Sequence, residues 1–264
     1  LSVFPSQTFI LNVDTAAVLK NIPLDEKLKP YIADKLVWKV SGSYIDKKTL
    51  AIMDMVVTNQ WKRPIYFSTT LSGEDYVGLR SYLQLEGLAY RLIPAVIPGA
   101  SQGWINADIM YDNMMNKYHW RNMNDSTIFY DENYKRFPAN ARHQFANLAQ
   151  QLLLEGDTVK ASKVIDRCFE VLPDAAIPYD YYSPDYISLL YKTGKEDEAD
   201  AMASLLGNRA EELIIYYKAT GHSSSSNDIR MQLVVLDGLY NEYREVGQMD
   251  KANKYYQLLQ KYYR

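Results

Sequence analysis

The sequence predicts an α+β protein: a small mixed α/β module, residues 1–130, followed by an α-helical array of about three helical hairpins, residues 131–264. Two observations lead to this prediction. The second half repeats one apolar pattern three times around a glycine, and the first half has no repeat but alternates short strand-like and helix-like stretches. We therefore expect two domains of different construction.

The repeat is a Gly followed five residues later by an Ala, in the pairs Gly156/Ala161, Gly194/Ala199 and Gly247/Ala252. Apolar residues recur at +3, +4, +7 and +11 from each Ala, and a second stripe precedes each Gly at −8, −7 and −4. These spacings are typical of two amphipathic helices joined by a tight glycine turn. A small residue after the turn lets the paired helices approach closely, and stacked hairpins usually form binding surfaces.

The first unit resembles a tetratricopeptide repeat, because its residues fit the W-x₂-L-G-x₂-Y…A-x₃-F…P pattern. The matching residues are Phe145, Leu148, Ala149, Leu152, Ala161, Ile165 and Pro173. The later units lack the closing Pro, and their Ala-to-Ala spacings are 38 and 53 residues. The longer spacing predicts a helix from about Lys195 to Gly221, a break at Ser223–Ser226, and a new helix capped by Asn227 or Asp228.

The first half reads as alternating helices and strands. Asp46 begins a helix that ends by Trp61, and Arg63-Pro64 stops it. Further helices are expected at Leu79–Leu85 and Asn106–Trp120, and strands at Pro64–Thr70, Leu88–Val96, Phe9–Val13, Leu36–Val40 and Ile128–Tyr130. The mixed order favours a small α+β or α/β module.

Two stretches in this half, Asn59–Phe67 (NQWKRPIYF) and Glu86–Pro94 (EGLAYRLIP), carry a family resemblance. They are similar to signature stretches of a bacterial family of polytopic membrane proteins that resembles protein O-mannosyltransferases. The resemblance extends from about Asp46 to the end of the chain. It implies a soluble region on the periplasmic side of the inner membrane, with any glycosyl transfer performed by a membrane-embedded part of the parent protein. Because the sequence starts at Leu1 rather than Met, we expect it to be a portion of a longer chain.

The composition argues against several classes of partner and site. Twenty-nine Lys and Arg against 32 Asp and Glu give a net charge of −3 without a basic block, which disfavours nucleic acid as a partner. The single cysteine, Cys168, lies on an apolar stripe and is expected to be buried. The 23 tyrosines are expected mainly at helix–helix contacts, with exposed rings for sugar stacking or peptide anchoring as the alternative.

No catalytic or metal-binding pattern is apparent. His119, His143 and His222 are scattered, and the paired carboxylates fall at turns or helix starts, where the helix dipole explains them. We therefore expect a fragment that is not an enzyme and needs no cofactor or metal. Its expected ligand is an acceptor protein, a peptide or a glycan. The alternatives are a carbohydrate-active or hydrolytic site in the first half, using Arg63, Glu86 or Arg91, and a purely structural domain.

The expected ligand surface is the side of the first helix of each hairpin that faces away from its packing stripe. This side mixes hydrogen-bond donors and acceptors with one aromatic ring, which suits an extended peptide or a glycan better than an acidic tail. The candidate residues are His143, Asn147 and Gln150 in the first unit, Tyr181, Asp185, Ser188 and Lys192 in the second, and Asp237, Asn241 and Arg244 in the third.

Overall fold

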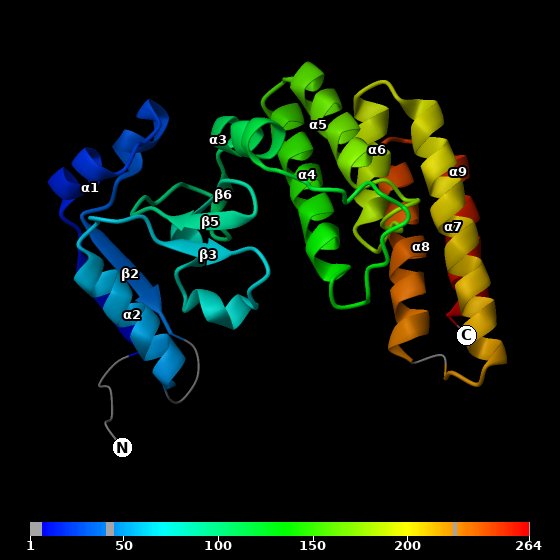
Figure 1. Ribbon diagram of the computed structural model, residues 1–264, viewed down its shortest axis with the longest axis horizontal. Coiled ribbons are helices and arrows are strands. Elements are labelled where there is room, and N and C mark those ends of the chain that lie inside the picture. Colours follow the sequence, from blue (N-terminus) through cyan, green and yellow to red (C-terminus); the bar gives the residue numbers. More distant parts are fainter. Residues whose placement is uncertain (1–6, 41–44, 224–225, 264) are drawn as a thin grey trace. The chain divides into compact units, whose positions relative to one another are not determined.

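The structure is a computed structural model, and it describes residues 7–40, 45–223 and 226–263 (Figure 1). The chain divides into two compact units, Leu1–Asn113 and Met114–Arg264. Over the described ranges, the first contains two small sheets with short helices and the second is built of helices, so the predicted α+β class is confirmed. The division falls earlier in the chain than residues 130 and 131, between which the sequence analysis placed it.

The first unit begins with a two-stranded antiparallel sheet of β1 (Thr8–Asn12) and β2 (Lys35–Lys39). Both predicted strands are therefore confirmed. In β2 the side chains of Leu36 and Trp38 are buried and their neighbours exposed, as expected for a strand with one covered face. The connection between the strands forms helix α1 (Thr15–Asn21) and the 3₁₀ helix η1 (Glu26–Tyr31), neither of which was predicted.

Helix α2 (Lys47–Asn59) begins as predicted because the Asp46 carboxylate accepts a hydrogen bond of 2.7 Å from the Thr49 amide. This hydrogen bond also lowers the pKa of Asp46. Of the predicted apolar stripe, Met53 and Val56 are buried, whereas Leu50 and Val57 are exposed. The helix thus buries a narrower face than its sequence indicated.

A second sheet has the strand order β3-β5-β4-β6. Its strands are β3 (Tyr66–Ser68), β4 (Leu83–Leu85), β5 (Ala89–Leu92) and β6 (Trp104–Ile105). β5 is antiparallel to β3 and β4, and β6 is parallel to β4. β3 is shorter than the predicted strand and lies at the edge of the sheet. Its side chains alternate as expected, with Phe67 buried and Tyr66 exposed.

The helix predicted at residues 79–85 is wrong. These residues form the 3₁₀ turn η3 (Arg80–Tyr82) and strand β4, shortly after a 3₁₀ helix η2 (Gly73–Tyr76). The Tyr82 hydroxyl donates to the Val37 carbonyl and accepts from the Val37 amide, at 3.0 Å each. Burial of β4 and its pairing with two strands therefore override a local helical pattern.

The helix predicted at residues 106–120 is only partly correct. Helix α3 (Ala107–Tyr111) is capped by the Asn106 side chain, and the chain continues as a π-helical segment, η4 (Asp112–Lys117). The strand predicted at Ile128–Tyr130 is wrong, because these residues lie in a stretch of turns and bends that precedes the helical array.

The described part of the second unit contains three helical hairpins, α4 with α5, α6 with α7, and α8 with α9 (Figure 1). Their bounds are α4 (Arg136–Leu154), α5 (Thr158–Val171), α6 (Tyr186–Lys192), α7 (Glu196–Ala219), α8 (Asn227–Glu245) and α9 (Met249–Tyr262). A 3₁₀ turn, η5 (Ser183–Asp185), leads into α6. The hairpins stack because α6 contacts both α4 and α8, and α7 contacts α8.

The predicted long helix is confirmed as α7. The predicted break after it includes residues 224 and 225, which lie outside the described residues. The next helix, α8, is capped by the Ser226 side chain instead of Asn227 or Asp228.

The three repeat glycines form the same turn. Gly156, Gly194 and Gly247 have φ of 82°, 77° and 76°, a left-handed conformation that glycine adopts without steric cost. In each turn the amide of the following residue donates to a carbonyl five residues earlier, as Asp157 does to Leu152 at 2.8 Å. Together with the glycine amide's own bond, this is the Schellman pattern. The alanines that follow, Ala161, Ala199 and Ala252, are fully buried, as predicted.

A buried arginine organises the connection between the first and second hairpins. The side chain of Arg142, on α4, is fully buried and pairs with Asp180 at 2.9 Å. Its guanidinium also donates to the carbonyls of Leu172, Ile177 and Pro178 at 3.1, 2.8 and 3.3 Å. One side chain therefore satisfies three backbone carbonyls of residues 172–178, a connection outside regular secondary structure.

A second polar cluster ties the last two hairpins together. The Asp200 carboxylate accepts hydrogen bonds from the hydroxyls of Tyr191 and Tyr243 at 2.8 and 2.7 Å, and from Lys251 at 2.5 Å. The ring of Tyr255 stacks on that of Tyr243 at 5.8 Å between centroids. Several of the abundant tyrosines thus occupy helix–helix contacts, where their rings are buried and their hydroxyls are bonded.

Replacing Arg142 with Met should lower the free energy of unfolding by about 3–5 kcal/mol, because the Asp180 carboxylate and three backbone carbonyls would lose their buried donor. Urea denaturation followed by circular dichroism measures this change. Arg136→Met, at an exposed position of the same helix, is the matched control and should change stability by about 0.5 kcal/mol or less. Equal effects of the two substitutions would contradict an organising role for Arg142.

Candidate functional site

The first helices of the three hairpins, α4, α6 and α8, lie next to one another. α6 contacts α4 on one side and α8 on the other, and η5 contacts both neighbours. The close approach of η5 to α8 depends on Gly238, because a Cβ there would lie 2.8 Å from a Pro184 side-chain carbon. Polar side chains from three separate sequence regions are thereby brought together.

The α4 end of this surface is aromatic. The His143 ring stacks on Tyr182 with centroids 4.4 Å apart, and Tyr181 packs against Tyr182 at 4.2 Å. His143 Nδ1 lies 3.7 Å from the nearer carboxylate oxygen of Asp185. Tyr181 is 40% exposed, so one aromatic ring and one carboxylate are accessible side by side.

Glu242, on α8, occupies the middle of the surface. Burial, together with the negative charges of Asp185 and Glu245, raises the pKa of its carboxyl to about 7. The Ser188 hydroxyl, which is buried and bonded to this carboxyl, and the Lys192 ammonium act in the opposite direction. Glu242 therefore changes its charge near neutral pH.

The far end is closed by an ion pair between Lys192 and Glu245, which joins α6 to the last turn of α8. We call this set of seven residues the inner cluster. Its members are His143, Tyr182, Asp185, Ser188, Lys192, Glu242 and Glu245.

Four of the ten residues predicted for ligand binding belong to the inner cluster: His143, Asp185, Ser188 and Lys192. Tyr181 lies beside it. Asn147 and Gln150 follow His143 at helical spacing on the same face of α4, where both are partly exposed. The Asn147 amide donates to Gln144 at 3.1 Å.

The three residues predicted from the last hairpin do not reach the inner cluster. Asp237 lines a pocket between α8 and α9, Asn241 donates to Asp237 at 3.1 Å, and Arg244 stacks on the ring of Tyr240 at 5.2 Å. The sequence analysis chose the wrong side of α8 as the ligand surface, because Gly238 and Glu242 face the second hairpin. Glu242 and Glu245 were missed for this reason, and Tyr182, which precedes η5, was also not predicted. A stripe through Gly238, Glu242 and Glu245 is the sequence signal that could have found two of them.

The alternative site in the first half is arranged differently. Glu86 and Arg91 are both buried and lie 3.8 Å apart. The two oxygens of the Glu86 carboxylate accept hydrogen bonds from Gln84 at 2.7 Å and from Tyr66 at 3.1 Å. Arg63 is exposed and lies outside this network. Glu86 therefore acts as the centre of an internal hydrogen-bond network.

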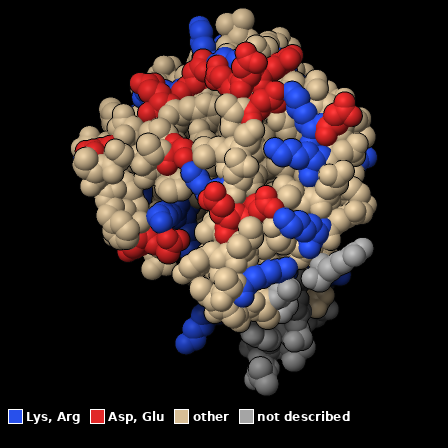
Figure 2. Space-filling view, turned by 90° about the vertical axis from the view of Figure 1, so that its right-hand side faces the viewer, with Lys and Arg blue, Asp and Glu red and all other residues tan. Residues whose placement is uncertain are grey.

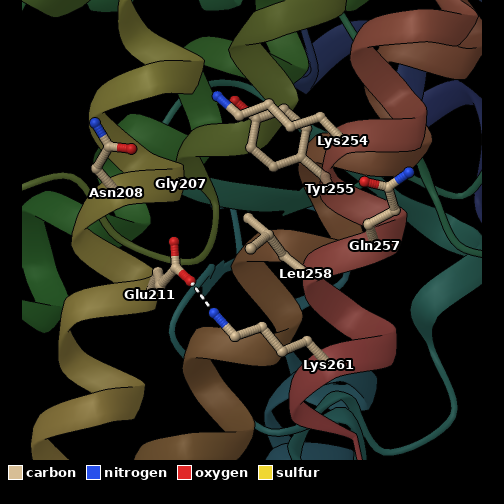
Figure 3. A pocket seen from close by; sticks show the side chains of 8 residues that line it. All are labelled: Gly207, Asn208, Glu211, Lys254, Tyr255, Gln257, Leu258 and Lys261. Atoms are coloured by element: carbon tan, nitrogen blue, oxygen red, sulfur yellow. Dashed lines mark hydrogen bonds and ion pairs between the residues drawn. The ribbon is translucent and has the colours of Figure 1, made fainter.

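A further pocket lies between α7 of the second hairpin and α9 of the third, with a volume of about 290 Å³ (Figure 3). Gly207 lets the Tyr255 ring approach α7, since a Cβ at residue 207 would lie 2.6 Å from the ring. An ion pair of 2.9 Å between Glu211 and Lys261 crosses the pocket (Figure 3).

On the face shown in Figure 2, acidic and basic side chains are interspersed, with acidic ones gathered along the upper edge.

Two features are absent from the residues that the structure describes. No group of three or more His, Cys, Asp and Glu side chains in these residues is arranged to hold a metal ion. No helix among the same residues is long and apolar enough to span a membrane.

Comparison with known proteins bears on the first unit. The family model described as TMEM260-associated domain 2 matches residues 1–109, which lie within that unit and include both stretches that carry the resemblance noted above. The match also includes the first forty residues, where that resemblance is weaker. No curated protein and no solved structure matches the chain. The first 109 residues are thus similar to a domain associated with TMEM260.

Glu242 should make stability depend on pH. Its pKa is raised on folding, so its contribution is present below about pH 4.5 and is lost as the pH rises through about 7. The free energy of unfolding should therefore fall between pH 5 and 8, by on the order of 2 kcal/mol after allowance for partial exposure. In Glu242→Gln this fall should disappear. Urea denaturation across this pH range tests it, with the exposed Glu212→Gln as control; parallel pH profiles of wild type and Glu242→Gln would contradict it.

Proposed function

We propose that this chain is a non-catalytic accessory domain of a membrane protein that resembles O-mannosyltransferases, and that it holds an acceptor protein, peptide or glycan on the periplasmic side of the membrane. The similarity of residues 1–109 to a TMEM260-associated domain supports the link to such a membrane protein. The two sequence stretches that resemble the bacterial family support the periplasmic side.

The inner cluster is the observation that carries the proposal. Stacked helical hairpins commonly recognise ligands on the surface formed by their first helices. Here that surface combines aromatic rings of the first and second hairpins with carboxyl groups of the second and third. The resemblance of the first hairpin to a tetratricopeptide repeat points to the same use.

The chemistry of the cluster selects among ligands. Tyr181 offers a ring face to an apolar surface of a sugar or a side chain, and Asp185 offers an acceptor for hydroxyl or amide donors. The carboxyls of Asp185 and Glu242 would repel an acidic ligand, and Lys192 and Glu245 already neutralise each other. Neutral glycans and neutral or basic extended peptides are therefore the favoured ligands.

The proposal leaves glycosyl transfer to the membrane-embedded part of the parent protein. In the first unit, Glu86 is bonded by Gln84 and Tyr66, an arrangement that suits a structural carboxylate better than a general acid. Deleting residues 1–264 from the parent protein should then abolish transfer to large acceptors while leaving transfer to a minimal acceptor intact. Loss of both would favour a purely structural role.

Binding by the inner cluster can be tested on this chain with a glycan array and a library of extended peptides of varied charge. The double variant Tyr181→Ala/Asp185→Asn should weaken binding at least about tenfold, because it removes the accessible ring and the accessible carboxylate. Its melting temperature should remain close to that of the wild type, since both side chains are partly exposed.

The matched control is Asn241→Ala/Arg244→Ala, which alters polar residues of α8 outside the inner cluster. This control should bind as the wild type does. Equal weakening in both double variants, or unchanged binding in Tyr181→Ala/Asp185→Asn, would place the ligand elsewhere.

A further inference from the structure

The outward side of the last hairpin carries a groove that the proposed function does not use. It lies between α8 and α9, has a volume of about 450 Å³, and is lined by residues of these two helices and by Tyr263. Val234, Tyr256 and Tyr263, which line it, are 49%, 44% and 78% exposed. Exposed apolar side chains that gather around a groove are typical of a surface that binds another protein.

The charges on α8 form a pattern whose signs exchange when the helix direction is reversed. Arg230 and Asp237 line the groove seven residues apart, with Leu233 and Val234 midway between them. Arg230 and Asp237 lie on one stripe of the helix, and Leu233 and Val234 flank that stripe on either side. A pattern of this kind is self-complementary when the helix meets an antiparallel copy of itself.

Neither charge is neutralised within one chain. Two helical turns separate Arg230 from Asp237 by about 10.5 Å along the axis, too far for an ion pair. Asp237 accepts a hydrogen bond from Asn241 at 3.1 Å, and within the described residues neither Arg230 nor Asp237 has an oppositely charged partner. Both side chains are exposed and can reach a second molecule.

We propose that this face binds a second copy of the chain, in a two-fold symmetric dimer with antiparallel α8 helices. The axis passes between Leu233 and Val234, which places Arg230 of each protomer opposite Asp237 of its partner. The exposed rings of Tyr256 and Tyr263 on the α9 side then extend the apolar contact on both sides of the axis. The interface is small, so the expected dissociation constant is micromolar, on the order of 10 µM.

Sedimentation equilibrium between about 1 and 200 µM of the chain tests this proposal. The wild type should change from monomer to dimer over this range. Arg230→Glu and Asp237→Arg each convert two attractive pairs into two repulsive ones, so each variant alone should dimerise at least about tenfold more weakly. Lys163→Glu, on the exposed side of α5, is the charge-reversal control and should dimerise as the wild type does.

The decisive measurement mixes the two single variants. The Arg230→Glu protomer carries negative charge at both positions of the stripe, and the Asp237→Arg protomer carries positive charge at both. The two are therefore complementary, and an equimolar mixture should form a heterodimer with about wild-type affinity. The double variant Arg230→Glu/Asp237→Arg should likewise regain self-association.

A monomeric wild type at about 200 µM, or a mixture that stays monomeric, would overturn the proposal and leave the groove to a different partner. Circular dichroism of each variant confirms that its helices are intact.

Discussion

The arrangement of the second unit depends on the buried guanidinium of Arg142. A buried arginine needs a partner for its charge, and here Asp180 and three backbone carbonyls accept from the two terminal nitrogens of the guanidinium. This requirement fixes the path of residues 172–180, which the chain could not fix through regular secondary structure. The next residues place Tyr182 against His143 and lead through η5 into α6. The position of the aromatic end of the inner cluster therefore follows from one buried interaction on α4.

The three hairpins of the second unit share one construction. Each hairpin has the same left-handed glycine turn and a buried alanine at the same position after it, so the two helices of each pair can pack closely. The residues that differ between the hairpins determine the packing and the charge of the surface formed by α4, α6 and α8. Pro184 and Gly238 bring η5 close to α8, and this contact moves Glu242 beside Ser188 and within the field of Asp185 and Glu245. A carboxyl that titrates near neutral pH is thus a consequence of packing between two hairpins.

Each unit uses one carboxylate to join several elements, although the two units differ in fold. In the first, Glu86 joins β4, β3 and the segment after α3 through Gln84, Tyr66 and Asn113. In the second, Asp200 joins α7 to α6, α8 and α9 through two tyrosines and a lysine. The network around Glu86 specifies one arrangement of its surrounding elements, because another arrangement would leave a buried charge without a partner.

The sequence by itself determined the class of the fold, the three hairpins, the cap of α2 and the burial of Cys168, because glycine turns, capping residues and helical periodicity act within a few residues. It also found four residues of the inner cluster. Only the tertiary structure decided that residues 83–85 form a strand, that Arg142 is buried, and that Glu242 rather than Asn241 joins the cluster. These outcomes depend on partners distant in the chain, such as β5 for β4 and residues 172–180 for Arg142. Local pattern carries no information about such partners, and a shift of one residue along a helix turns a side chain by about 100° toward a different neighbour.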